Sequence, residues 1–274
     1  MRKAGRRWGW WGAGVGAFIG LIIYAPASWL AQTITEISGK RLILAESQGT
    51  VWHGDAIAVL TGGLGSRDAR ALPGRLSWTM RLQGAGLRLT LQQDCCIPTP
   101  VVLLVAPGWN RLKVDVRFQT SPTDTSVAAL QGSGEVGHWP AAWLGGLGTP
   151  WNTLQLGGIA RLSSHELTFE VVEGRLRVQG QADLWLDNVS SRVTTLDRLG
   201  SYRLDFNGDA QGQMQIQLST VDGALQLSGQ GTMGVSGLHF SGEARANEAE
   251  RGALDNLLNI IGRRVGDRSV ISIG

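Results

Sequence analysis

Residues 214–231, MQIQLSTVDGALQLSGQG, decide the fold class of this chain. Apolar and polar residues alternate on both sides of Asp222-Gly223, which is the period-2 pattern of half-buried strands. A two-residue Asp-Gly loop favours a type I′ turn, so the pattern predicts a hairpin with Leu218 opposite Leu227 on an apolar face. The same register pairs Gln217 with Ser228 on a wholly polar face. Both strands agree on which side meets water.

The same alternation surrounds two other turns, at Glu173-Gly174 and at residues 83–86. The predicted apolar pairs are Val171–Leu176, Phe169–Val178 and Leu167–Gly180 at the first turn, and Leu82–Leu87, Met80–Leu89 and Trp78–Leu91 at the second. The residues predicted to point outward at the second turn are Thr79, Arg81, Arg88 and Thr90. Further strands are expected at 112–118, 202–206 and 238–244. Strands with one wet face each indicate an antiparallel meander, because buried parallel strands read as continuous apolar runs.

Glycine has the most unusual count in the composition, 39 of 274 residues. Several glycines fall on the apolar side of the predicted strands, where the missing Cβ lets a sheet bend. They are Gly180, Gly208, Gly229, Gly231 and Gly242. The sequence therefore predicts a mainly β fold built on a strongly curved antiparallel sheet.

Two short helices are expected among the strands. The first covers residues 138–147, with Pro140 suited to its first turn. The second is C-terminal and amphipathic: Asn247 and Glu250 are the residue types of a capping box, and Gly262 suits the position after the helix. Its apolar face consists of Leu254, Leu257, Leu258 and Ile261. We expect this face to pack on the sheet.

The N-terminal region has the features of a membrane anchor. No charged residue lies between Trp8 and Thr35, and residues 12–31 are long enough for a crossing of roughly 30 Å. Tryptophans at the start, with Tyr24 and Trp29 near the end, suit the two membrane interfaces. A signal peptide cleaved after Ala27 is the competing interpretation, since residues 25–27 form a small-x-small site. The proline inside that site favours an uncleaved anchor.

Charge sets the orientation of this anchor and argues against nucleic-acid binding. Four basic residues before the span keep the N-terminus cytoplasmic, so the rest of the chain is exported. They are Arg2, Lys3, Arg6 and Arg7. Because they exceed the formal net charge of +3, the remaining residues carry about −1, with arginines scattered singly. Despite a sequence pI of about 9.2, no basic patch for nucleic acid is expected.

The chain has two cysteines, Cys95 and Cys96, and they are neighbours. In an oxidising compartment they could form a vicinal disulfide, which is strained because adjacent Cα atoms are only about 3.8 Å apart. They could also form an intermolecular link, or act as two small apolar residues that close a turn. These three interpretations stay open, and the pair is the only candidate site that the sequence offers.

No pattern for catalysis, cofactor binding or metal binding is found. Two glycine strings, beginning at Gly132 and Gly229, match the dinucleotide fingerprint as bare text, but neither joins a strand to a helix. The four histidines are dispersed and the carboxylates look isolated on wet faces or in turns. We therefore expect no enzyme, no cofactor and no metal site.

Several phrases, taken together and in order along nearly the whole chain, carry a family resemblance. They are APASWLA at 25–31, GTVWHG at 49–54, LSW at 76–78, GTPWN at 148–152, residues 218–229 and 257–264. The chain resembles type II secretion system protein N. This resemblance implies a single-pass inner-membrane accessory of the machine that moves folded proteins from the periplasm across the outer membrane. It supplies no catalytic residues.

The resulting hypothesis has three parts: a basic cytoplasmic N-terminus at 1–11, a transmembrane signal-anchor at 12–31 and a periplasmic β-rich domain at 32–274. The expected partners are other inner-membrane secretion subunits, contacted through exposed sheet edges, and self-association is open. The alternative is a lipid-handling or envelope-scaffold module, in which the apolar face of a bent sheet holds an acyl chain. We expect an ordinary packed core on that face in preference to lipid.

Overall fold

The computed structural model describes residues 2–120, 129–149, 151–209, 211–234 and 237–274. Strands dominate it, which confirms the mainly β fold. The helical elements are α1 (Arg2–Ile23), α2 (Ala27–Ile37), η2 (Ala141–Leu147), α3 (Trp151–Leu154), η3 (Glu248–Glu250) and α4 (Arg251–Ile261). The strands up to the middle of the chain are β1 (Leu42–Gly49), β2 (His53–Thr61), β3 (Ala69–Ala71), β4 (Leu76–Gln83), β5 (Gly86–Gln93), β6 (Ile97–Gly108), β7 (Arg111–Gln119), β8 (Leu130–Gln131) and β9 (Ser133–Pro140). They are followed by β10 (Leu156–Val172), β11 (Arg175–Ser191), β12 (Gly200–Gly208), β13 (Met214–Gly223), β14 (Leu225–Gly234), β15 (Gly237–Ala246), β16 (Arg263–Val265) and β17 (Arg268–Ile273).

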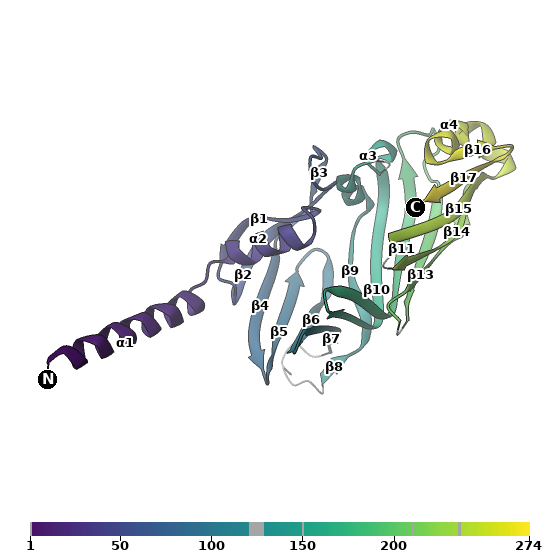
Figure 1. Cartoon of the computed structure of the whole chain (residues 1–274). Coiled ribbons are helices and arrows are strands. Elements are labelled where there is room, and N and C mark those ends of the chain that lie inside the picture. The colour runs from purple at the N-terminus through teal and green to yellow at the C-terminus, as the bar shows by residue number, and fades with distance from the viewer. Residues whose placement is uncertain (1, 121–128, 150, 210, 235–236) are drawn as a thin grey trace.

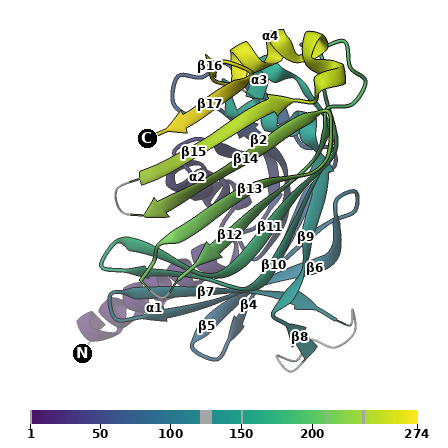
Figure 2. The ribbon, with the colours of Figure 1, turned by 90° about the vertical axis from the view of Figure 1, so that its right-hand side faces the viewer.

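The strands follow one another in space nearly as they do in sequence (Figure 1). Antiparallel neighbours run β1–β2–β4–β5–β6–β7–β10–β11–β12–β13–β14–β15–β17–β16. The strands β3, β8 and β9 attach to β2, β7 and β10. Strand direction rotates along this order, from steep in β4 to oblique in β15 and β17 (Figures 1 and 2). The predicted meander is therefore one open, strongly twisted sheet.

The N-terminal helix ends earlier than predicted. α1 stops at Ile23, and α2 begins at Ala27, after Pro26. Pro26 is extended and forms an isolated antiparallel bridge with Thr50. Proline lacks the N–H that would continue a helix, so a single helix over 12–31 is wrong. None of the helices in the described ranges combines the length and the hydropathy needed to span a membrane.

α2 belongs to the β-rich module. Ala27 and Ala31 are 1% and 7% exposed and pack in one apolar cluster with Leu44, Ala56 and Trp78. Short alanine side chains let the helix lie close to the strands beneath it. The module therefore includes residues that the sequence interpretation assigned to the span, and it begins directly after Pro26.

Two of the three predicted hairpins have the expected register. At the 83–86 turn all three predicted pairs are present, from Leu82–Leu87 to Trp78–Leu91. At Glu173-Gly174 both turn residues have positive φ, 51° and 77°, as a type I′ turn requires, and the first two predicted pairs are present. The predicted Leu167–Gly180 pair is wrong, because a bulge between His165 and Thr168 interrupts the register.

The hairpin around Asp222-Gly223 has a different register from the predicted one. Leu218 pairs with Gly229, not with Leu227, which is a shift of two residues. Asp222 and Gly223 do not form the turn; they extend β13 and pair with Ser201 and Gly200 of β12. Gly223 has a φ of 128°, a conformation that favours glycine. Because a shift of two keeps every side chain on its face, the predicted apolar and polar faces still hold.

One prediction about faces is wrong at the β4–β5 hairpin. Arg88 was expected to point to solvent, yet it is 7% exposed, while Leu82, expected on the dry side, is 77% exposed. At this hairpin the alternation of residue types therefore does not correspond to an alternation of burial.

Within the described residues, the buried apolar side chains of the sheet form three clusters. α2 covers the first, at β1, β2 and β4. The middle cluster centres on Val101, Val116 and Phe118. The third lies under α4, where Leu254, Leu257 and Leu258 are at most 1% exposed and pack against strands β11–β15. α2 and α4 thus cover opposite ends of one long sheet, and the expected packing of the C-terminal helix on the sheet is confirmed (Figures 1 and 2).

The ends of the two predicted short helices differ from expectation. His138 and Trp139 belong to β9, so the first helix is reduced to η2, which starts after Pro140. Asn247 and Glu250 form no capping box: η3 precedes α4, and neither helix has a side-chain cap. Gly262 does follow α4, in an extended conformation where a Cβ would lie 2.5 Å from the Val270 carbonyl oxygen.

Candidate functional site

The polar face of strands β10–β17 carries a continuous row of hydrophilic side chains. Across five strand pairings, in register, the row consists of Asp183, Asp205, Gln217, Gln230, Ser241 and Ser272. The rows that alternate with it, such as Leu184, Leu204 and Leu218, turn toward α4. We call the surface defined by this row and its flanking residues on the same side the polar face.

An ionic network occupies the β10–β12 part of the polar face. Arg203 lies 2.9 Å from Asp183 and 2.6 Å from Asp205, so one guanidinium joins both carboxylates. His165 Nε2 lies 3.3 Å from the second oxygen of Asp183. The two carboxylates are 15% and 22% exposed. The network links three adjacent strands without being enclosed.

The two carboxyl groups differ in their affinity for protons. Partial burial alone would raise the pKa of Asp183, but hydrogen bonds from Asp205 and Arg203 outweigh it and hold that pKa below its usual value. In Asp205, partial burial and the hydrogen bond to Asp183 raise the pKa. The hydrogen bond to Asp183 raises the pKa of Arg203, which stays charged. Two neighbouring carboxyl groups repel each other when both are ionised, so their pKa values separate.

Aromatic stacking continues the network toward the neighbouring residues. The guanidinium of Arg203 lies 4.9 Å from the centre of the Trp185 ring, and that of Arg161 lies 5.9 Å from it. Arg161 also pairs with Asp187 at 2.8 Å. Each arginine therefore meets both a carboxylate and an aromatic ring, which fixes its orientation. The result is an ordered platform of alternating charges.

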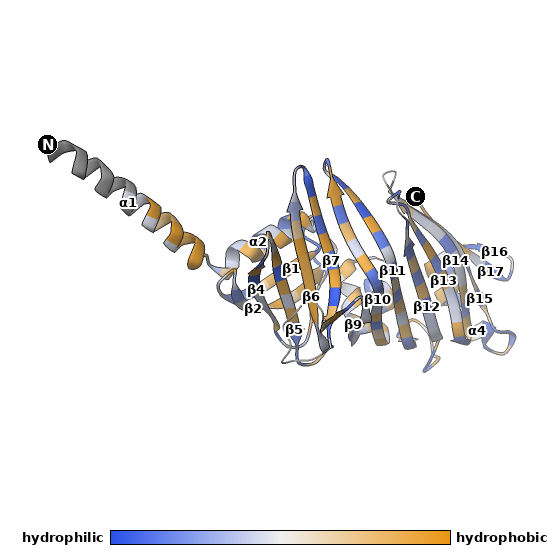
Figure 3. Cartoon of the chain, turned by 90° about the horizontal axis from the view of Figure 1, so that it is seen from below, coloured by the Kyte–Doolittle hydropathy of each residue, from blue (hydrophilic) through white to orange (hydrophobic). Residues whose placement is uncertain are grey.

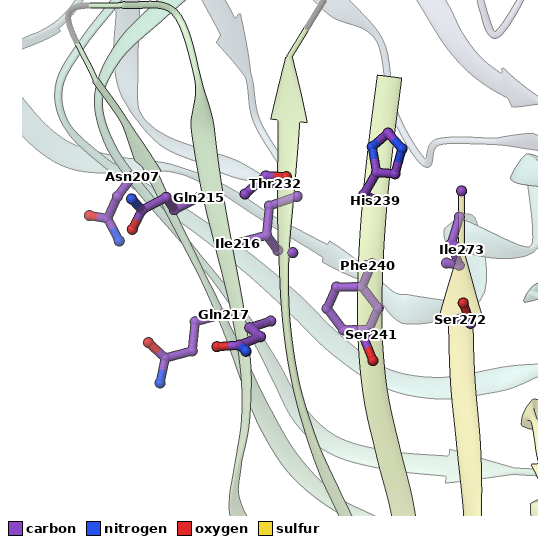
Figure 4. A pocket seen from close by; sticks show the side chains of 13 residues that line it. Asn207, Gln215, Ile216, Gln217, Thr232, His239, Phe240, Ser241, Ser272 and Ile273 are labelled. Atoms are coloured by element: carbon purple, nitrogen blue, oxygen red, sulfur yellow. The ribbon is translucent and has the colours of Figure 1, made fainter. Parts of the chain in front are cut away.

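A hollow of about 510 Å³ lies beside this platform, over β12–β15 and β17 (Figure 4). Amide, hydroxyl and imidazole side chains line much of it: Asn207, Gln215, Gln217, Gln230, Thr232, His239, Ser241 and Ser272. Residues of the intervening row, Ile216, Gly231, Phe240 and Ile273, complete its lining. Amides both donate and accept hydrogen bonds, so this surface suits polar, uncharged groups such as a polypeptide backbone.

The cysteine pair lies in the other half of the sheet, in the turn between β5 and β6. Cys95 and Cys96 are bonded to each other as a vicinal disulfide. Cys96 is 4% exposed, and its carbonyl oxygen accepts a hydrogen bond from His138 N–H at 2.8 Å. Cys95 is exposed, with its sulfur 3.0 Å from the carbonyl oxygen of Pro73. A disulfide sulfur has no hydrogen to donate, so this last approach is a contact and not a hydrogen bond.

The other residues considered from the sequence lie apart. Across the parts of the chain that the structure describes, no three metal-ligating side chains gather at one point. Gly132, which starts one glycine string, lies between β8 and β9, and the second string lies within β14, so neither precedes a helix. His138 pairs with Glu135 at 2.9 Å, while His53 contacts Thr79.

Sequence reasoning missed the Asp183–Arg203–Asp205 network. We interpreted the carboxylates as isolated, and for Asp183 and Asp205 this is wrong, since they are direct cross-strand partners. The strand at 202–206 was predicted, but its partner was not. Had β11 been aligned with β12 through Gly180–Gly208, the two aspartates would have faced each other, because register fixes every later pair.

Comparison with known proteins gives one family. The model of the family described as type II secretion system protein N matches residues 40–271. That range takes in strands β1–β16, most of β17, the polar face apart from Ser272, and the cysteine pair. No curated protein and no solved structure matched the chain.

Proposed function

Because the chain belongs to the type II secretion system protein N family, and so has a role in type II secretion, we propose that it is an inner-membrane accessory component of that machinery. In this proposal α1 is the membrane anchor and the β-rich module lies in the periplasm. The module acts by contact with other inner-membrane subunits and catalyses no reaction.

The observation that carries this proposal is the exposure of the apolar side of α1. Six large apolar side chains between Val15 and Ile23 are 41–65% exposed, namely Val15, Phe18, Ile19, Leu21, Ile22 and Ile23. The C-terminal end of α1 therefore presents an exposed, mainly hydrophobic surface (Figure 3). Water penalises such a surface by roughly 25 cal/mol per Å², so a surface of this kind needs an apolar environment.

The uncharged part of α1 is shorter than a full bilayer crossing. From Trp8 to Ile23 a helix rises about 22 Å at 1.5 Å per residue, less than the roughly 30 Å hydrocarbon core. Local thinning of the bilayer accommodates such a mismatch. The basic residues before Trp8 support a cytoplasmic N-terminus and a periplasmic module.

The contacts around Pro26 support an anchor that is not cleaved. Cleavage after Ala27 would remove Ala27 itself, which is 1% exposed, and the Pro26–Thr50 bridge. It would also remove the hydrogen bond from Val51 N–H to the Ala25 carbonyl oxygen. A processed chain would leave these partners on the module unpaired.

The polar face supports contact with other proteins. Its amide-lined hollow and its platform of paired charges offer hydrogen bonds without a strong net charge, which is typical of specific, reversible protein surfaces. We assign this face to the other inner-membrane secretion subunits.

Replacement of two exposed glutamines tests this assignment. Gln217→Arg with Gln230→Arg fills the hollow with bulk and positive charge, so crosslinking followed by purification from native membranes should recover fewer secretion subunits. The matched control is Gln48→Arg, an exposed glutamine on β1 at the other end of the sheet. Equal recovery from both variants would assign the contact to another surface.

Secretion itself tests the role in the cell. Deletion of the protein should leave folded exoproteins in the periplasm without changing their synthesis or their export through the inner membrane. Residues 25–274 behind a cleavable signal retain α2 and should complement poorly, because an untethered module is diluted through the periplasm. Full complementation by that form would contradict a need for the anchor.

A lipid-handling or envelope-scaffold module is the second candidate function, favoured by one feature. A hollow of about 380 Å³ at the β4–β7 turns is lined mainly by apolar residues, among them Leu87, Leu104, Val105 and Pro107. Lipid that stays bound after gentle purification, together with normal secretion in a deletion strain, would support this function over the secretion component.

A further inference from the structure

Three hairpin turns expose large apolar side chains. Trp109, between β6 and β7, is 100% exposed. Leu82 at the β4–β5 turn is 77% exposed, and Leu176 at the β10–β11 turn is 58% exposed. Turns of soluble proteins are normally polar. A tryptophan side chain that is fully exposed to solvent at a turn therefore marks an interaction site.

These turns lie side by side along one margin of the sheet, at the ends of neighbouring strands. Leu87 pairs with Val105 and Arg111 with Val172, so the three turns project from the same ends of their strands. The N–H of Glu173 in one turn donates to the carbonyl oxygen of Asn110 in the next. We call residues 81–87, 105–113 and 170–177 the tip edge, since they form the ends of three neighbouring hairpins.

The end of α1 meets the sheet at the same edge. The indole N–H of Trp52 donates to the Ile22 carbonyl oxygen at 2.8 Å, which ties the last turn of α1 to the β1–β2 turn. The carbonyl oxygen of Trp52 accepts a hydrogen bond from Met80 N–H, two residues before Leu82. The chain therefore leaves α1 and enters the module beside the tip edge, whereas α3 and α4 lie at the opposite margin (Figure 1).

Charge on the tip edge is mainly positive. Its three ranges hold five basic residues and two acidic ones; the basic residues are Arg81, Arg111, Lys113, Arg175 and Arg177. Arg81, Arg175 and Arg177 are exposed at the turns themselves. Because the chain beyond its first seven residues carries about −1, this margin is a local positive region on a nearly neutral module.

We propose that the tip edge docks on the surface of a phospholipid bilayer that contains anionic lipid. Trp109, Leu82 and Leu176 insert at the headgroup level, where tryptophan is favoured, and the arginines contact anionic headgroups. The sheet then stands on the membrane, with the margin at α3 and α4 directed away from it. This inference rests on the proposed function through α1, because insertion of α1 brings the tip edge to the bilayer.

Hydrogen exchange in nanodiscs tests the docking. The full chain is reconstituted in nanodiscs of phosphatidylcholine alone and of phosphatidylcholine with phosphatidylglycerol. In the anionic discs, amides of residues 83–86, 108–111 and 173–175 should exchange about tenfold more slowly than in the neutral discs. The variant Leu82→Ser with Trp109→Ser should lose this protection. The matched control is Leu64→Ser, which is 76% exposed in the β2–β3 loop at the opposite margin and should retain it.

The outcomes separate this proposal from the anchor. Failure of the chain to co-elute with the discs would overturn both. Co-elution without protection of the turns, or with equal protection in both lipids, would overturn anionic docking alone. Protection of the turns in detergent without phospholipid, rising with protein concentration, would assign the tip edge to contact between two copies of the chain and would also overturn the proposal.

Discussion

The hydroxyl of Thr220 donates a hydrogen bond to the carbonyl oxygen of Leu227 at 2.8 Å and accepts one from the N–H of Leu227 at 2.6 Å. The threonine side chain thus replaces a backbone partner at the point where β13 and β14 separate. Beyond it, Asp222 and Gly223 pair with β12. One side chain therefore fixes a register that the turn residues alone do not specify.

Thr220→Val should lower the free energy of unfolding by about 1–2 kcal/mol, because the substitution keeps the side-chain shape but removes both hydrogen bonds. The control is Thr232→Val, an exposed threonine on β14, which should change it by less than about 0.5 kcal/mol. Urea unfolding of both variants measures the difference. Similar values would show that the Thr220 pair does not hold the register.

The third apolar cluster depends on α4. Leu258→Ala should cost about 2–5 kcal/mol, since Leu258 is 0% exposed and its removal leaves a cavity against the sheet. Ile260→Ala, two residues away on the same helix and 38% exposed, should cost much less. Thermal unfolding that shifts equally for both would mean that α4 does not pack as described.

The two aspartates of the ionic network should have opposite effects on stability. The lowered pKa of Asp183 means that its stabilisation is present above its ordinary value of 3.8 and is lost as pH falls through the lowered pKa. The raised pKa of Asp205 means that its contribution is present below 3.8 and is lost as pH rises through the raised pKa. At pH 7 the ionised form of Asp205 therefore opposes folding.

Asp183→Asn should accordingly lower the free energy of unfolding at pH 7 by about 1–2 kcal/mol. At about pH 3 the same substitution should lower it by less. Asp205→Asn should raise it at pH 7. Urea midpoints at the two pH values check both signs. If Asp205→Asn proves the more damaging at pH 7, the raised pKa of Asp205 is wrong.

Membrane attachment should depend on the exposed apolar side of α1. Phe18→Asp places a charge on a side chain that is 65% exposed, which should move the protein from the membrane fraction to the soluble fraction. Ile37→Asp changes an even more exposed side chain, 83%, at the end of α2, and should leave attachment intact. Carbonate extraction and immunoblotting distinguish the two.

The cysteine pair should resist thiol labelling until it is reduced. Alkylation of the unreduced protein should add no mass, because each sulfur is bonded to the other. After mild reduction under native conditions, Cys95 should react faster than Cys96, which is 4% exposed. Mass spectrometry of the alkylated peptides reports both steps, and rapid labelling of the unreduced protein would show free thiols.

The sequence alone determined the fold class and, apart from Leu82 and Arg88 at the β4–β5 hairpin, the faces of the strands. Alternation of residue types is a local property with a period of two, so it identified β13, β14 and the hairpins at 83–86 and 173–174, and it separated Gln217 from Leu218 correctly. The apolar face of the C-terminal helix was equally readable, because three leucines at helical spacing need a partner surface.

Tertiary structure decided the register of each strand and which segments cover it. A shift of two residues preserves both faces, so alternation cannot detect it, and the position of Leu218 depended on β12 and on Thr220. The same holds for the Asp183–Arg203–Asp205 network, whose members become neighbours only through long-range pairing. Burial at the β4–β5 hairpin, where Arg88 is covered and Leu82 is not, also depends on contacts between distant segments. The interaction energies that favour one register over another come from contacts between residues far apart in the sequence. A local sequence pattern carries no information about those contacts.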